Sequence, residues 1–164
     1  MNHKIYTVDD NAIMRVFLSN LLKKFGVVHA FTDGEELLNA LEKGGAPAII
    51  ILDLNLPGIQ GIELLDKIQS EHKHLNPKIF VVSGVDNSEE RIKCLSKGAM
   101  DFISKPFHPK ELEYKVINGL SMSYIHWGTY DDHIHDAHLI KQLNHEYIDI
   151  QNYDNQIESI RQSP

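Results

Sequence analysis

Five short apolar runs alternate with five helical stripes along the first 120 residues of the chain. The runs are rich in Ile, Val and Phe and are bounded by turn residues, as expected for strands. Between them, apolar residues recur every three or four positions, as in Ile13, Phe17 and Leu21, which is the spacing of an amphipathic helix. The predicted strands cover residues 4–8, 27–31, 48–53, 78–83 and 101–104.

This strict alternation predicts an α/β fold with a parallel sheet and helices on both faces. Right-handed crossovers would bring the carboxyl ends of all the strands to one edge. Gly26, Gly44 and Gly98 follow predicted helices, where a left-handed cap favours glycine. Asp33 and Ser88 are predicted as helix N-caps.

The helical period breaks near residue 121, where we place a domain boundary between a domain at 1–120 and an extension at 121–164. The extension carries seven acidic and two basic residues of a chain whose net charge is -7. Such an acidic segment repels phosphate backbones, so direct nucleic-acid binding is not expected.

The composition is ordinary for a globular protein, with 42% hydrophobic and 24% charged residues. No apolar stretch reaches the roughly 18 residues of a membrane span, and no signal peptide is visible at the N-terminus. The single cysteine, Cys94, excludes an internal disulfide and is predicted to be a small core residue. These features favour a cytoplasmic location.

Charged residues stand at the ends of three predicted strands. Asp9 and Asp10 follow the first strand, Asp53 closes the third and Lys105 follows the fifth. Clustered carboxylates would raise one pKa unless a cation bound, and hard oxygen ligands select Mg²⁺ or Mn²⁺. An aspartate beside such a cation can attack a phosphoryl donor, and a lysine neutralises the developing charge. Ser83, at the end of the fourth strand, offers a hydroxyl donor.

Four ordered motifs carry a family resemblance over about residues 3–120. They are Val8-Asp9-Asp10-Asn11, then Leu52-Asp53-Leu54-Asn55-Leu56-Pro57-Gly58, then Val82-Ser83-Gly84, and the run from Lys97 to Phe107 that contains Lys105-Pro106. Together they resemble the receiver domain of two-component response regulators, related to the chemotaxis receiver. The resemblance implies a doubly wound, flavodoxin-like five-stranded sheet of order 2-1-3-4-5. We also expect a cis peptide bond at Lys105-Pro106.

The resemblance also implies roles for individual residues. Asp53 would be the phosphoacceptor, and Lys105 would contact the phosphoryl group. Asp10, Asp53 and the main-chain carbonyl of Asn55 would bind Mg²⁺ or Mn²⁺, with Asp9 either a supporting residue or a direct ligand. Ser83 and Phe102 would form a switch pair.

The implied function is a signalling switch, not an enzyme with turnover. A sensor histidine kinase or phosphotransfer protein would donate the phosphoryl group, Phe102 would move inward, and the surface near residues 86–107 would change its partner preference. The alternative is a haloacid-dehalogenase-like phosphatase with an aspartyl nucleophile, whose nucleophile would lie on the first strand with a second aspartate two positions later. A downstream output domain or protein is expected, and no membrane partner.

The extension leaves two interpretations open. His133, His135 and His138 resemble a metal motif, but a solvated helix start is favoured because one short run lacks a full ligand set. An apolar stripe then predicts a helix, which either forms a homodimer through a coiled coil or packs back on the receiver. The stripe comprises Ile140, Leu143, Tyr147, Ile150 and Ile157.

Overall fold

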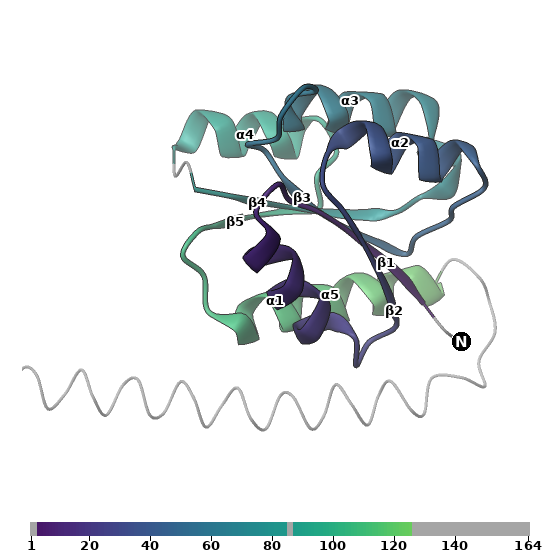
Figure 1. The fold of residues 1–164 in the computed structure, drawn as a ribbon, viewed down its shortest axis with the longest axis vertical. Coiled ribbons are helices and arrows are strands. Elements are labelled where there is room, and N and C mark those ends of the chain that lie inside the picture. The colour runs from purple at the N-terminus through teal and green to yellow at the C-terminus, as the bar shows by residue number, and fades with distance from the viewer. Residues whose placement is uncertain (1–2, 85–86, 126–164) are drawn as a thin grey trace, which may run out of the picture. The chain divides into compact units, whose positions relative to one another are not determined.

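A five-stranded parallel sheet forms the centre of the computed structural model, which describes residues 3–84 and 87–125. The strand order is β2-β1-β3-β4-β5, as predicted (Figure 1). Val8 lies opposite Leu52, and Ser83 lies opposite Ser104, so the carboxyl ends of the strands form one edge. The strands are β1 (Lys4–Val8), β2 (Val27–Phe31), β3 (Ile49–Asp53), β4 (Lys78–Ser83) and β5 (Asp101–Ser104).

Two layers of helices cover the sheet (Figure 1). One layer holds α1 (Ala12–Leu22) and α5 (Pro109–Ile125), and the other holds α2 (Gly34–Glu42), α3 (Gly61–Glu71) and α4 (Ser88–Ser96). A short 3-10 helix, η1, spans Lys73–Leu75. None of the helices in the described ranges is long and apolar enough to cross a membrane.

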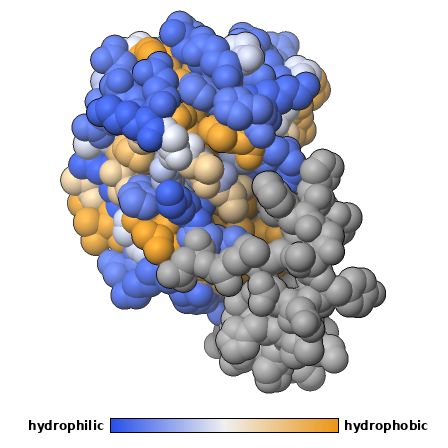
Figure 2. Space-filling view, turned by 90° about the vertical axis from the view of Figure 1, so that its right-hand side faces the viewer, coloured by the Kyte–Doolittle hydropathy of each residue, from blue (hydrophilic) through white to orange (hydrophobic). Residues whose placement is uncertain are grey.

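The core follows from the position of each strand in the sheet. All five residues of β3 are buried, because helices cover both of its faces and strands flank both of its edges. Strand β2 is an edge strand, and Val27 there is 44% exposed. The outer surface of the α2–α3 layer is largely hydrophilic in the view of Figure 2, as expected for helices that bury only one face. Cys94 is fully buried, as predicted.

The helix ends confirm some predictions and correct others. Asp33 caps α2 as predicted, since its carboxylate accepts a hydrogen bond from the backbone N–H of Glu36. The prediction that Ser88 caps α4 is wrong: Asn87 has the extended backbone, and its side chain accepts from the N–H of Glu90 at 2.6 Å.

Two of the three glycines predicted at helix ends have a left-handed backbone, with φ of 88° at Gly44 and 93° at Gly98. Gly26 does not, so its predicted role was wrong. A Cβ there would lie 2.3 Å from the carbonyl oxygen of His3, and this close approach is what requires glycine.

The fifth helix does not break at residue 121. It continues to Ile125, and the Ser121 hydroxyl donates to the carbonyl oxygen of Ile117 within the helix. Such a bond satisfies a serine without ending the helix, which explains why the composition misled the prediction. The boundary proposed after residue 120 therefore falls within α5, and the division into 1–120 and 121–164 stays a prediction.

The predictions made for the extension lie outside the described residues. They concern the metal motif at His133, His135 and His138, the apolar stripe from Ile140 to Ile157, and self-association through that stripe.

Thr7 in β1 provides a test of the core. Its side chain is fully buried, and Oγ1 has no hydrogen-bond partner among the described residues. We expect Thr7→Val to raise the free energy of unfolding by about 1 kcal/mol, because a methyl group of nearly the same shape replaces an unsatisfied hydroxyl. Equilibrium denaturation measures this change.

Thr32→Val is the matched control, since the Thr32 hydroxyl donates to the Asp33 carboxylate at 3.2 Å. It should bring no gain in stability. A loss of stability in Thr7→Val would mean that the buried hydroxyl is satisfied.

Candidate functional site

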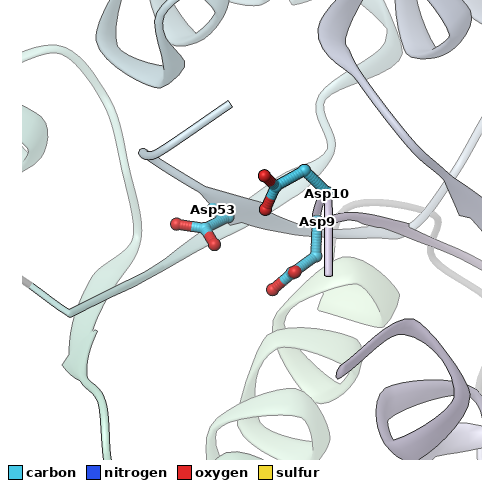
Figure 3. Close-up of side chains that lie close together, drawn as sticks. All are labelled: Asp9, Asp10 and Asp53. Atoms are coloured by element: carbon cyan, nitrogen blue, oxygen red, sulfur yellow. The ribbon is translucent and has the colours of Figure 1, made fainter. Parts of the chain in front are cut away.

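Three carboxylates meet at the carboxyl ends of β1 and β3 (Figure 3). Asp9 and Asp10 follow β1 and Asp53 closes β3, and an oxygen atom from each lies within 4.8 Å of the others. Asp9 is 1% exposed and Asp53 5% exposed, whereas Asp10 lies at the surface. The three carboxylates predicted for a cation site therefore lie close together.

Backbone and side-chain hydrogen bonds hold the turn after β1. The Asp9 carboxylate accepts from the backbone N–H of Asn11 at 2.8 Å, and Asn11 in turn caps α1. The Arg15 guanidinium donates to the carbonyl oxygens of Asp9 and Asp10 at 2.9 and 2.8 Å. Arg15 thus ties α1 to the main chain of the acidic turn and restrains the backbone that carries both carboxylates.

Lys105 places its ammonium between the two buried acids. Nζ lies 2.8 Å from Asp9 Oδ2 and 2.7 Å from Asp53 Oδ2. Burial alone would lower the pKa of Lys105, but hydrogen bonds and charge from Asp53 and Asp9 outweigh it, so the pKa is raised. The ammonium therefore stays protonated and neutralises part of the cluster.

The chain around Lys105 is fixed by its neighbours. The Lys105 N–H donates to the Ser83 carbonyl at 2.7 Å, which joins the ends of β4 and β5. The Lys105-Pro106 peptide bond is cis, as predicted.

A close approach between α3 and the end of β3 shapes the other side of the site. The Gly61 N–H donates to the Leu54 carbonyl at 3.1 Å. A Cβ on Gly61 would lie 2.4 Å from Leu54 Cα and 2.6 Å from the main-chain carbonyl oxygen of Asp53. Only glycine fits there without moving this backbone. Asp53 Oδ1 also accepts a hydrogen bond from the Asn55 N–H at 3.0 Å. This bond holds the start of the loop that carries the Asn55 carbonyl against the Asp53 carboxylate.

Ser83 and Phe102 lie on neighbouring strands beside the acids. Ser83 is fully buried at the end of β4. Phe102 lies opposite Val81 in β5, is 2% exposed and belongs to the apolar cluster that contains Cys94 and Ala99. Because alternate residues of a strand share a face, Ser83 and Phe102 lie on the same side of the sheet.

Two residues that shape the site were missed in the sequence. Arg15 lies within an ordinary helical period, and nothing in its spacing marks it as a contact of the acidic turn. Gly61 did carry a signal, because it is a glycine that precedes an apolar helical stripe and begins α3. A glycine at such a position indicates that another backbone segment approaches closely.

The comparisons with known proteins agree with this geometry. The family model of the response regulator receiver domain matches residues 5–117. A chemotaxis protein CheY homolog of Campylobacter jejuni subsp. jejuni is 33% identical over 116 residues, which cover 69% of this chain and 88% of that protein. The solved structure of a BeF3-activated DrrB receiver domain aligns with a TM-score of 0.68 at 29% identity, covering 74% of this chain and 99% of that one.

Longer relatives contain the same unit. Hybrid signal transduction histidine kinase D of Dictyostelium discoideum is 32% identical over 120 residues, 72% of this chain but 8% of the kinase. The chain thus spans a small part of that relative. The haloacid-dehalogenase-like alternative is wrong, because the sequence matches receiver domains over most of its length. The chain belongs to the response regulator receiver domain family.

Proposed function

We propose that this chain accepts a phosphoryl group on Asp53 from a histidine kinase or a histidine phosphotransfer protein. One observation carries the proposal, the surroundings of the buried Asp53 carboxylate. One of its oxygens lies 2.7 Å from the Lys105 ammonium, and it has an oxygen within 4.8 Å of carboxylate oxygens of Asp9 and Asp10. An Asp53 oxygen would bond to phosphorus as the phosphorus–nitrogen bond of the donor histidine breaks. The histidine nitrogen leaves with the electron pair of that bond.

The donor set fits Mg²⁺ or Mn²⁺. All three clustered side chains are carboxylates, which these hard cations prefer, and Asp10 is open to solvent as a partly hydrated ion requires. Asp10, Asp53 and the main-chain carbonyl of Asn55 would hold the cation, with Asp9 in support. When bound, the cation would neutralise charge on the transferred group.

Lys105 would link phosphorylation to the protein surface. Its ammonium now bridges Asp9 and Asp53, and a phosphoryl group on Asp53 would offer it more charge to bind. Ser83 would donate its hydroxyl to the same group. Ser83 ends β4 and Lys105 directly follows β5, so their adjustment would reach the surface near residues 86–107 and change its affinity for an output protein or domain.

An exposed apolar face of α1 suits the phosphodonor protein. Ile13 is 81% exposed, Val16 61% and Phe17 37%, and the helix begins directly after the acidic turn. A donor histidine must approach Asp53 closely, so the donor must cover neighbouring surface. We place an apolar helical surface of the donor on this face.

The phosphoacceptor assignment predicts that acetyl phosphate with Mg²⁺ adds one phosphoryl group to the parent chain and none to Asp53→Asn. The amide of asparagine cannot act as the nucleophile. Intact mass spectrometry measures the addition, with Asp33→Asn as the control that should still be modified. Modification of the Asp53→Asn chain would refute the assignment.

The metal assignment predicts that Asp10→Asn lowers the affinity for Mg²⁺ at least about tenfold, since a neutral amide replaces a carboxylate ligand. Calorimetric titration measures the affinity. Glu35→Gln removes the same charge from an exposed position on α2 and should leave the affinity unchanged. Equal affinities in Asp10→Asn and the parent would exclude Asp10 as a ligand.

The docking assignment predicts that Val16→Asp slows transfer from a histidine-phosphorylated kinase domain by about tenfold, because burying a new carboxylate in an apolar contact is costly. Labelling by acetyl phosphate, which needs no docking, should be unchanged. The donor is chosen as one that labels the parent chain. Ile92→Asp, on the exposed surface of α4, is the control. Equal transfer to Val16→Asp and the parent would place the donor elsewhere.

A further inference from the structure

Arg91 of α4 covers the ring of Phe102 in β5. Its guanidinium carbon lies 5.2 Å from the ring centroid, within the range of a cation–π interaction. A guanidinium nitrogen also lies 3.4 Å from the Ser104 hydroxyl oxygen. Both contacts join α4 to β5, the strand that ends just before Lys105.

The buried position of Phe102 needs a physical cause. A phenyl ring has no hydroxyl group, so a hydrogen bond from its own side chain cannot hold it in place. What remains is burial within the apolar cluster that also contains Cys94 and Ala99, together with the charge of Arg91 over the ring. Arginine suits this role because its planar guanidinium stacks on an aromatic face while staying in contact with water.

The Phe102 ring occupies an inward, buried position. The family resemblance implies that Phe102 moves between an outward and an inward position, and with 2% of its surface exposed the ring is here inward. Contacts that the ring makes only in its inward position bias the equilibrium between the two positions toward that one.

We propose that Arg91 is a positioning residue that holds the Phe102 ring in its inward position. The inference rests on the proposed function, which gives Phe102 its role in the switch. Arg91 thereby sets how much of the conformational change is left for phosphorylation to drive. Arg91 also contacts Ser104, the residue directly before Lys105, so it touches β5 both at the Phe102 ring and beside the phosphoryl-contacting lysine.

The test measures the ratio of outward to inward Phe102 rings in the unphosphorylated full chain. Relaxation dispersion of ring-labelled phenylalanine detects a minor outward population on the microsecond to millisecond timescale. Removing a cation–π contact at an exposed site should raise the ratio about two- to five-fold in Arg91→Ala. Arg91→Lys keeps a cation, so its outward-to-inward ratio should lie between those of the parent and Arg91→Ala.

Lys93→Ala is the matched control. It removes the same charge from the same exposed helix, two residues away, and should leave the ratio unchanged. Equal ratios in Arg91→Ala and the parent, including no detectable outward ring in either, would overturn the proposal. An equal rise in Lys93→Ala would overturn it as well, because the contact with the ring would not be the cause.

The measurement uses neither a phosphoryl donor nor Mg²⁺. A chain that acetyl phosphate fails to modify on Asp53 would contradict the proposed function while leaving the ring ratios informative. An unchanged ring ratio in a chain that is modified on Asp53 would contradict only the role of Arg91.

Discussion

The contact of Lys105 with Asp9 and Asp53 is the interaction on which the rest of the site depends. The parallel sheet brings both acids to the edge where β1 and β3 end, and both are buried there. Removing the partner of a buried charge commonly costs about 3–5 kcal/mol, although Lys105 is 21% exposed and solvent weakens the contact. The fold therefore needs a cation at this edge. Lys105 supplies one, and the proposed Mg²⁺ would supply more charge when a phosphoryl group arrives.

The backbone around this contact is held from several directions. Arg15 fixes the turn after β1 from α1, Gly61 lets α3 approach the end of β3, and the Lys105 N–H joins the ends of β4 and β5. Each restraint acts on main-chain atoms, so the acids keep their positions whichever partner their oxygens contact. That rigidity is what phosphoryl transfer asks of a protein, since its chemistry depends mainly on positioning and charge.

The sequence predicted what depends on local pattern and chain order. All five strands follow from their apolar runs, and the position of Asp53 at a strand end was enough to suspect a site there. The errors at two helix ends have local causes. Asn87, and not Ser88, caps α4, and the Ser121 hydroxyl forms a hydrogen bond inside α5 instead of ending the helix. Arg15, Gly61 and Arg91 act through contacts between elements that only the three-dimensional packing brings together. The family resemblance, and not periodicity, predicted the strand order and the role of Ser83 and Phe102 as a switch pair.

The most direct test of this account is the stability of Lys105→Met with and without Mg²⁺. Without divalent cations, the account predicts a loss of about 2–3 kcal/mol in the free energy of unfolding, because two buried carboxylates lose their shared partner. Saturating Mg²⁺ should stabilise the variant more than the parent, since no ammonium competes for the acids. Lys97→Met, which removes a lysine paired with the largely exposed Asp66, should lose at most about 1 kcal/mol and gain nothing extra from Mg²⁺. A Lys105→Met chain as stable as the parent, with the same response to Mg²⁺, would contradict the account.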